Sequence, residues 1–285
     1  MAIKISNNAG SHLTREFPMS DHNFVRIKNI AYKITGINLT DQKKNMVYSR
    51  LARRIRDRNL NSFDQYCDLI ESSGNNEITD FVNAITTNLT SFFREGHHFD
   101  YLKSTVFPFL LKKHAKTQRI RMWSAGCSTG EEPYSIAICL KESMPVKAWD
   151  IKLLGTDLDT NVVQHASQGI YSIDRVDGLD TPIKKKWFKT DSSGENALVA
   201  SELKKIVTFK QLNLLDQWPM SGPFDVIFCR NVVIYFDKET QRKLFDHFAD
   251  LLAPDGYLFI GHSENLSKVT DRFELIGRTI YRRIK

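Results

Sequence analysis

The stretch from Arg119 to Ala137 constrains the fold more than any other part of the chain, because it has the pattern of a buried strand, a glycine-bounded loop and the first turn of a helix. Backbone N–H groups in such a loop can approach a nucleotide-like ligand. From Arg119 onward, strand-length apolar runs alternate with helical segments, and two short strands around Gly277-Arg278 close the pattern. This alternation predicts an α/β fold with a mostly parallel sheet, covered by helices on both faces and carrying an antiparallel edge.

The residues before this stretch have a different pattern. Residues 1–18 are polar and aperiodic, which predicts a flexible tail. Apolar residues then recur at helical spacing in four segments, 20–36, 40–58, 62–72 (closed by Gly74) and 77–89. They predict a small all-helical N-terminal domain over residues 19–90, followed by the α/β domain over residues 91–285.

One segment of the α/β domain departs from the alternation. Residues 171–203 are rich in Lys, Asp, Ser and Gly, and two short runs, 187–189 and 197–200, flank Ser192-Ser193-Gly194. This pattern predicts an antiparallel hairpin, and hence a small β-subdomain inserted at about residues 185–205.

The charge of the chain is concentrated in one helix. The net charge is +7, and residues 43–58 hold seven basic residues and one acid, a local balance of 7 − 1 = +6. Such a helix suits a nucleic acid or an acidic protein surface equally well. The four cysteines are widely spaced, which predicts neither a disulfide framework nor a metal site. No apolar run resembles a leader or a membrane span, so we expect a cytoplasmic protein.

Polar residues follow each predicted strand of the α/β domain, where ligands of such sheets bind. They are residues 125–130, Asp157, Asn213, Arg230 with Asn231, and residues 261–264. Each could also be a turn or cap residue, and Asp157 has an even chance of being the N-cap of the following helix. Cys127 is interpreted as a small residue that fills a tight turn.

The glycine loop narrows the choice of ligand. Gly126 and Gly130 do not form G-x-G-x-x-G, which argues against NAD or FAD. Glu131 and Glu132 stand where a phosphate-binding loop would carry Lys and Ser or Thr, and their charge would repel a triphosphate. S-adenosylmethionine carries positive charge and no phosphate, and its ribose hydroxyls suit a carboxylate such as Asp157.

Four motifs then carry a family resemblance, at residues 87–94, 123–135, 228–236 and 261–264. With the helical N-terminal segment, the chain from about residue 20 to its end resembles the CheR-type chemoreceptor methyltransferases. These enzymes transfer a methyl group from S-adenosylmethionine to glutamate side chains of transmembrane chemoreceptors and release S-adenosylhomocysteine. The resemblance implies a Rossmann-like methyltransferase domain behind the helical domain.

The resemblance also implies roles for individual residues. It places Arg94 and Tyr235 nearest the transferring methyl, and it leaves open whether Arg94 contacts the cofactor or the acceptor. The implied cofactor-binding residues are Asn88, Thr90, Arg94, Gly126, Glu132, Asp157, Asn213, Leu214, Arg230 and Asn231.

Two surfaces are implied to meet the receptor. Arg50, Arg53, Arg54 and Arg56 would contact its methylation helices, although such a helix is more often merely solvated. The inserted β-subdomain matches a unit that in some members of the family binds a peptide at the receptor's C-terminal tail.

Two other functions compete with receptor methylation. An amino-methylating nucleic-acid enzyme would carry Pro-Pro and an aromatic residue after Asn231, where this chain has Val232-Val233-Ile234. A non-catalytic S-adenosylmethionine-binding regulator of the receptor would keep the motifs without the chemistry. We expect a monomeric enzyme with no nucleic-acid partner, no metal and no direct insertion into the membrane.

Overall fold

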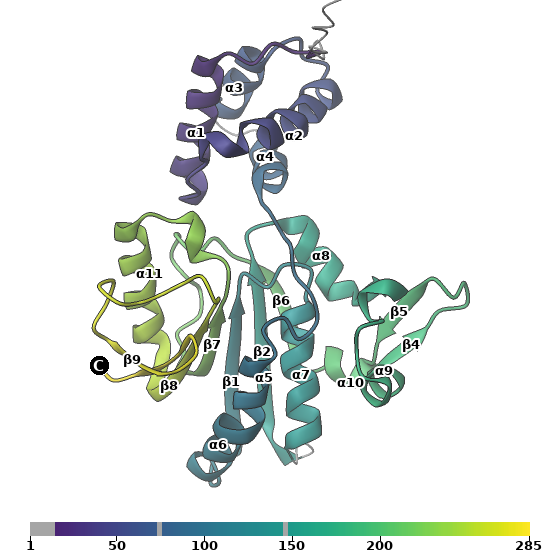
Figure 1. The fold of residues 1–285 in the computed structure, drawn as a ribbon, viewed down its shortest axis with the longest axis vertical. Helices are drawn as coiled ribbons and strands as arrows, with labels where there is room; N and C mark the ends of the chain where they lie inside the picture. Colours follow the sequence, from purple (N-terminus) through teal and green to yellow (C-terminus); the bar gives the residue numbers. More distant parts are fainter. Residues whose placement is uncertain (1–14, 73–75, 145–147) are drawn as a thin grey trace, which may run out of the picture.

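The computed structural model describes residues 15–72, 76–144 and 148–285. A small helical domain is joined to a larger sheet domain, from whose side a third, smaller unit projects (Figure 1). Most of the expected tail, and Gly74, lie outside the described residues. In the described part of the chain, no helix has both the length and the apolar character needed to cross a bilayer.

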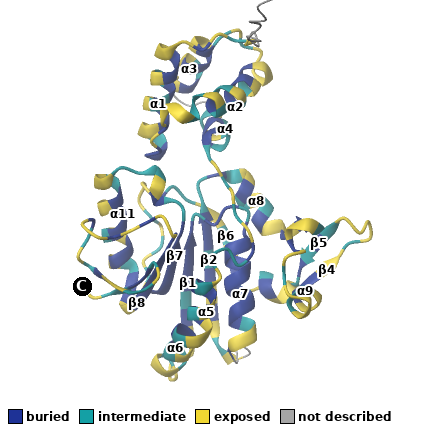
Figure 2. Ribbon diagram, viewed as in Figure 1, coloured by how far each residue is buried: buried dark blue, intermediate teal, exposed yellow. Residues whose placement is uncertain are grey.

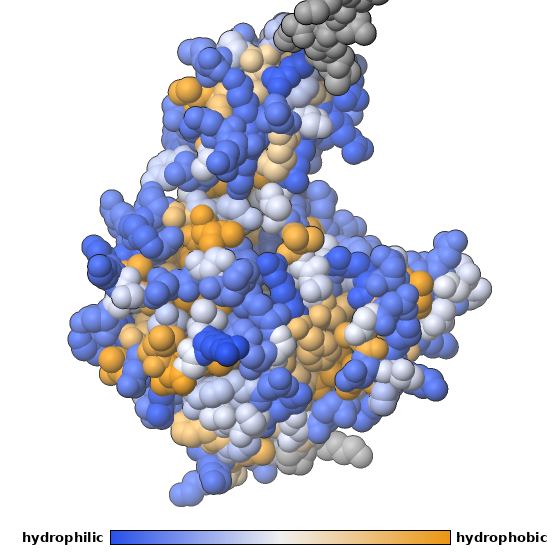
Figure 3. Space-filling view, viewed as in Figure 1, coloured by the Kyte–Doolittle hydropathy of each residue, from blue (hydrophilic) through white to orange (hydrophobic). Residues whose placement is uncertain are grey.

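The helical domain contains the four predicted helices. Ser20 caps the first through its hydroxyl, and Gly36 ends it at φ +68°. The apolar faces of the four helices pack into one core, while the outer face of the domain seen in Figure 3 is mostly hydrophilic. The elements are α1 (Asp21–Thr35), η1 (Asp41–Lys43), α2 (Lys44–Asp57), α3 (Phe63–Glu71) and α4 (Glu77–Ile85).

The fourth helix is shorter than predicted, because it ends at Ile85 and not near Leu89. Thr86 is extended, and its hydroxyl donates to Asp159 Oδ2 at 2.8 Å. The Asn88 amide donates to the same oxygen at 2.7 Å. These polar side chains bond to the sheet domain and draw the chain out of the helix.

One seven-stranded sheet forms the centre of the larger domain. Its order is β6 (Val207–Gln211), β2 (Asp150–Asp157), β1 (Arg119–Ala125), β7 (Phe224–Cys229), β8 (Leu252–Ile260), β10 (Ile280–Arg283) and β9 (Phe273–Gly277). The first five strands are parallel, and β10 pairs antiparallel with β8 on one side and with β9 on the other, which confirms the predicted sheet with its antiparallel edge. After β1 the chain builds outward through β2 to β6 and then returns to β7, so the strand order reverses beside β1.

Helices cover both faces of this sheet, whose strands are largely buried (Figure 2). Successive side chains of β1 point to opposite faces, so Met122 joins the core under α7 while Trp123 joins the core under α11. The helices are α5 (His97–Tyr101), η2 (Leu102–Val106) and α6 (Phe107–Lys113), which run on from one another, then α7 (Glu131–Ser143), α8 (Thr160–Gln168) and α11 (Lys238–Leu251), with the short η5 (Val233–Tyr235) after β7.

The insertion is larger than the predicted hairpin. Its strands β4 (Phe188–Thr190) and β5 (Asn196–Val199) do pair as predicted, but β3 (Ile170–Ser172) adds a third strand. Trp187 ends a helix instead of opening β4. A three-residue strand that pairs with a distant segment leaves no local pattern, which explains the miss. We call residues 170–204 the inserted subdomain; it also contains η4 (Ile173–Arg175), α9 (Thr181–Trp187) and α10 (Ser201–Lys204).

Candidate functional site

A pocket lies between the helical domain and the carboxyl ends of β1, β2 and β7, where the strand order reverses. It holds an empty volume of about 1050 Å³, part of which opens to solvent, and pockets for small organic ligands are of this order. Its lining includes all the residues that the sequence placed around the cofactor and the methyl group: Asn88, Thr90, Arg94, Gly126, Glu132, Asp157, Asn213, Leu214, Arg230, Asn231 and Tyr235.

The loop after β1 forms one wall of the pocket. Gly126 has φ +86°, and a Cβ at this position would lie 2.3 Å from Val232 Cγ2, so no side chain fits. The Ser128 N–H donates to Asp157 Oδ2 at 2.8 Å and ties the loop to the end of β2. Burial raises the pKa of the Cys127 thiol well above its usual value, which agrees with a filler of the turn and not a nucleophile.

Asp157 presents a carboxylate to the pocket at the end of β2. It is not the N-cap of α8, because that cap is Asp159, whose Oδ1 accepts the N–H groups of Asn161 and Val162. Burial raises the pKa of Asp157 to about 6, against the opposing effect of hydrogen bonds from the Asp159 and Ser128 N–H groups. A half-buried carboxylate of this kind is a fitting acceptor for the hydroxyl groups of a ribose.

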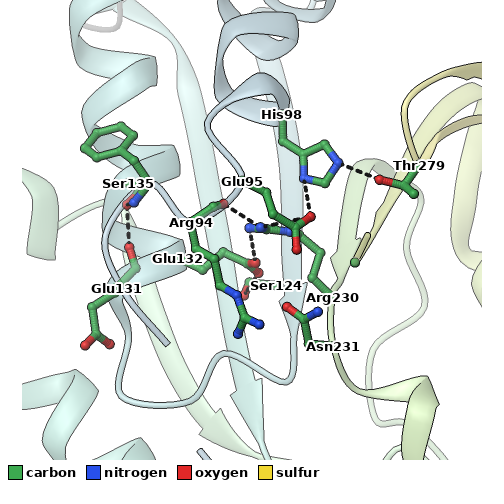
Figure 4. A network of polar contacts seen from close by, with 12 residues as sticks. Arg94, Glu95, His98, Ser124, Glu131, Glu132, Ser135, Arg230, Asn231 and Thr279 are labelled. Carbon is green, nitrogen blue, oxygen red and sulfur yellow. Dashed lines mark hydrogen bonds and ion pairs between the residues drawn. The ribbon is translucent and has the colours of Figure 1, made fainter. Parts of the chain in front are cut away.

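Glu132 and Arg230 form a buried ion pair beside the pocket (Figure 4). Glu132 Oε2 lies 3.0 Å from Arg230 Nη1, and its Oε1 accepts the Ser124 hydroxyl at 2.7 Å. The other Arg230 nitrogen, Nη2, donates to the main-chain oxygen of Arg94 and lies 3.4 Å from Glu95 Oε2. Arg230 therefore offsets the charge of Glu132 and holds the backbone at Arg94.

The expectation that Glu131 acts on the ligand through its charge is wrong. Its side chain is 0% exposed, is ion-paired with Arg175 of η4, and does not line the pocket. In Figure 4 it points away from the Arg230 cluster. Neighbouring helical residues point about 100° apart, so only one of two adjacent glutamates can face the pocket. Asp157 and, in part, Glu132 are therefore the acids whose charge disfavours a phosphate in this pocket.

Residues 86–96, here called the linking loop, cross from α4 to α5 and carry Arg94. Phe93 and Glu95, on either side of it, have φ +51° and +59°. Non-glycine residues rarely adopt this conformation, and such strain is found at functional sites. Arg94 Nη1 donates to Leu89 O at 2.9 Å. Burial raises the pKa of Tyr235, and the positive charge of nearby Arg94 opposes that rise.

Asn213 and Asn231 line the pocket and also hold its parts together. The Asn213 amide donates to Ile34 O at 3.0 Å and so bonds the sheet domain to the helical domain. Asn231 has φ +58°, and its N–H donates to Glu264 Oε2 at 3.0 Å. Leu214 is buried at the pocket wall.

The four arginines assigned to the receptor lie outside the pocket lining and differ in their surroundings. Arg54 donates to buried Glu77 at 2.9 and 2.8 Å, so it braces α2 against α4. Arg50 donates to the main-chain oxygens of Ala84 and Thr86, at the end of α4. Arg53 and Arg56 are exposed, and Arg56 lies 3.2 Å from Glu16.

Two family models match the chain. One, described as the SAM binding domain of CheR methyltransferase, matches residues 88–282, and the other, described as its all-alpha domain, matches residues 22–86. The chain belongs to the CheR methyltransferase family. Its pocket is therefore that of a SAM-binding domain, and S-adenosylmethionine is its cofactor.

Curated CheR relatives match almost the whole chain. A chemotaxis protein methyltransferase of Escherichia coli is 43% identical over 275 residues, covering 94% of this chain and 93% of that protein. Chemotaxis protein methyltransferase 2 of Pseudomonas aeruginosa is 42% identical over 272 residues, covering 94% and 95%. A third, from Borreliella burgdorferi, is 42% identical and covers 85% and 87%. The resemblance and the chemotaxis methyltransferase function predicted from the motifs are confirmed.

Further residues, which the motifs did not assign to the cofactor, line or support the CheR pocket of this chain. Lys43 lines it, with its Nζ 4.3 Å from the centre of the Tyr235 ring, and Thr35 and Ile37 line it from the end of α1. Buried Glu264 accepts N–H groups of Asn231 and Val233, both at 3.0 Å. Glu264 does not line the pocket but holds the loop after β7, which does. It belongs to the motif at residues 261–264, and Lys43 belongs to the basic segment, but spacing alone shows neither contact.

Proposed function

We propose that this protein transfers the methyl group of S-adenosylmethionine to side-chain carboxylates of glutamates in chemoreceptors, with S-adenosylhomocysteine as product. The observation that carries the proposal is the group of cations around Tyr235. Lys43 lies against its ring, and Arg94 lines the same pocket. Arg50 is close enough for its charge to lower the pKa of Lys43, an effect second to that of burial. Such a group attracts an acidic acceptor.

A carboxylate acceptor fits the chemistry that the pocket offers. A glutamate side chain, whose pKa in water is about 4.3, is already ionised at pH 7, so its attack needs no general base. S-adenosylmethionine supplies the electrophilic methyl group. The protein has to align and desolvate the reactants, which can supply much of the acceleration. We assign Asp157 and the Gly126 loop to holding the donor, and Arg94 with Tyr235 to placing the acceptor.

We assign the remaining arginines of α2 to the receptor. Arg53 and Arg56 are exposed in the C-terminal part of this helix, whose N-terminal end is next to Lys43 of the pocket, and can meet the acidic methylation helices of a receptor. Arg50 and Arg54 support the same surface from within the domain. We place the protein in the cytoplasm and expect it to act as a monomer on the cytoplasmic helices of transmembrane chemoreceptors.

The receptor's C-terminal tail peptide is a second proposed contact. In the three-stranded sheet of the inserted subdomain β4 lies at an edge, and among the described residues no further strand pairs with it. An extended peptide can add to such an edge. Titration calorimetry with synthetic receptor tail peptides tests this contact, and the absence of binding to any of them would remove it from the proposal.

Incubation with tritiated S-adenosylmethionine and receptor-bearing membranes tests the proposed reaction. We expect base-labile label on receptor protein, as a carboxyl methyl ester requires. Label on added RNA would favour a nucleic-acid methyltransferase. Confirmed cofactor binding without label on any acceptor would favour a non-catalytic regulator.

Replacing Arg94 tests its assigned role in this reaction. We expect Arg94→Ala to lower methyl transfer about a hundredfold or more, because the guanidinium that positions the acceptor carboxylate is lost. The fold should persist, since the Arg94 side chain is bonded to a loop oxygen and not to the core. Arg119→Ala is the matched control, because Arg119 is an exposed cation at the end of β1 that lies away from the pocket. Near-normal turnover of Arg94→Ala would reject the assignment.

A further inference from the structure

The inserted subdomain contacts the linking loop directly. The Arg175 guanidinium, from η4, donates to Thr90 O at 2.9 Å and to Glu131. Thr90 is one of the residues implied to bind the cofactor, and Arg94 follows four residues later. The inserted subdomain therefore contacts the backbone that carries both groups, although it lies to the side of the sheet in Figure 1.

A second contact secures the same loop. Phe92 is buried against two aromatic rings of the inserted subdomain, Tyr171 at 5.0 Å and Phe188 at 5.2 Å between ring centres, both edge to face. The Tyr171 hydroxyl also donates to Thr129 O at 2.7 Å, in the loop after β1. Two of the loops that line the cofactor pocket thus contact this subdomain.

Arg175 and Arg230 hold the linking loop at two points. Arg230, in the sheet domain, donates to the oxygen of Arg94, and Arg175 donates to the oxygen of Thr90. Each arginine is also paired with one of the adjacent glutamates, Arg230 with Glu132 and Arg175 with Glu131. The backbone that leads to Arg94 is therefore held at Thr90 and at Arg94 by charged donors with fixed geometry.

We propose that Arg175 is a positioning residue for the transfer reaction: through Thr90 it holds the linking loop in the conformation that binds S-adenosylmethionine and orients Arg94. The inserted subdomain then has a part in the site itself, whatever it binds on its outer edge. The proposal deepens the proposed function and rests on it for the orientation of the acceptor. The part of the proposal that concerns S-adenosylmethionine binding rests only on the identity of this domain as a SAM-binding domain.

Arg175→Ala alone would not separate positioning from charge compensation, because it also leaves the buried Glu131 carboxylate without its cation. A second substitution, Glu131→Gln, removes that charge. The full-length wild type, Arg175→Ala, Glu131→Gln and the double variant are compared by thermal unfolding, by calorimetric affinity for S-adenosylhomocysteine, and by kcat and KM in receptor methylation. Lys185→Ala, an exposed cation of α9, is the control on the same subdomain.

We expect the double variant to regain the unfolding temperature of the Glu131→Gln protein but to keep an affinity about tenfold weaker and a lower kcat, because the Thr90 contact is still missing. Recovery of wild-type affinity and kcat by the double variant would overturn the proposal, as would wild-type behaviour of Arg175→Ala. If Arg175→Ala does not fold, Arg175→Lys decides. The shorter Lys side chain keeps the positive charge near Glu131 but does not place its ammonium where Arg175 Nη2 makes both contacts, so weaker binding supports the proposal and wild-type binding overturns it. The affinity comparison holds even if no receptor is methylated, so failure of the proposed function is seen separately.

Discussion

Asp157 shows how a single pocket residue can couple ligand binding to pH. Burial raises the pKa of its carboxyl to about 6 in the protein without ligand. Between the unfolded pKa near 4 and this value, the folded state holds a proton that the unfolded state has lost. The contribution of Asp157 to stability therefore falls as pH rises through this window. A ligand whose hydroxyl groups donate to the charged carboxylate reverses this preference.

We expect the affinity for S-adenosylhomocysteine to fall below pH 6, approaching about tenfold for each pH unit, because binding then requires loss of the Asp157 proton. Titration calorimetry between pH 5 and pH 7.5 measures this dependence. Asp157→Asn should bind weakly at every pH with little pH dependence, whereas Asp174→Asn, an exposed carboxylate of the inserted subdomain, should behave as wild type. An affinity that stays constant down to pH 5 would contradict the role of Asp157.

The two glutamates after the glycine loop mark the limit of prediction at this scale. Their charge could be read from the sequence, and so could their place at the start of a helix. Their counter-ions could not, because Arg175 and Arg230 are far away in the chain and reach them only through the fold. Glu132 remains at the pocket, while Glu131 belongs to the junction with the inserted subdomain.

At the scale of elements, α2 divides its arginines between structure and surface. Arg54 is bonded to Glu77, whose side chain is 1% exposed and also accepts the Tyr66 hydroxyl at 2.7 Å. Arg53, one residue earlier, is exposed. Adjacent helical residues face different directions, so one basic run both stabilises the helical domain and leaves cations for a partner.

We expect Arg54→Ala to lower the free energy of unfolding by about 2 kcal/mol, because a buried carboxylate loses two charged donors. Arg53→Ala should change stability by no more than about 0.5 kcal/mol but should raise the KM for receptor several-fold. Chemical denaturation and receptor methylation separate the two effects. An Arg54→Ala protein of wild-type stability would contradict the structural role of Arg54, and an Arg53→Ala protein with unchanged KM would contradict the receptor-binding role of Arg53.

Helices and strands were predicted correctly where a local pattern determines them, and were missed or given wrong ends where contacts with distant residues determine them. The capped helix α1 and the strands β1, β2 and β7 follow from periodicity and burial. The end of α4 does not, because Thr86 and Asn88 leave the helix to bond Asp159, which is distant in sequence. The strand β3 was missed for the same reason, since its three residues are ordered by pairing with β5.

At the scale of the molecule, the pocket exists because two domains meet. Thr35 and Ile37 of the helical domain line it, and Gly36 between them ends α1 at φ +68°. The Asn38 N–H donates to Tyr235 O at 2.9 Å, so the junction also reaches the proposed catalytic tyrosine. The helical domain thus contributes to the cofactor pocket as well as to the proposed receptor surface.

Gly36→Ala should disturb both stability and binding. A Cβ there would lie 2.3 Å from Leu215 Cδ1 of the sheet domain, and the left-handed backbone costs a non-glycine residue about 1–2 kcal/mol. We expect the free energy of unfolding to fall by about this amount, measured by chemical denaturation, and S-adenosylhomocysteine to bind more weakly, measured by calorimetry. Gly178→Ala, where a Cβ meets nothing within 4 Å, should change neither. Wild-type binding by Gly36→Ala would show that the junction does not shape the pocket.

The sequence by itself determined the helical domain, the parallel sheet, the family and the residues that converge on the pocket. These depend on local periodicity and on short motifs at strand ends, which are present in any unfolded copy of the chain. The tertiary structure alone decided how charges are paired around the loop from Arg119 to Ala137. It directed Glu132 to Arg230 and Glu131 to Arg175, and it brought Lys43 to Tyr235. Such pairings depend on which distant segments become neighbours, and this is set by the packing of the whole molecule.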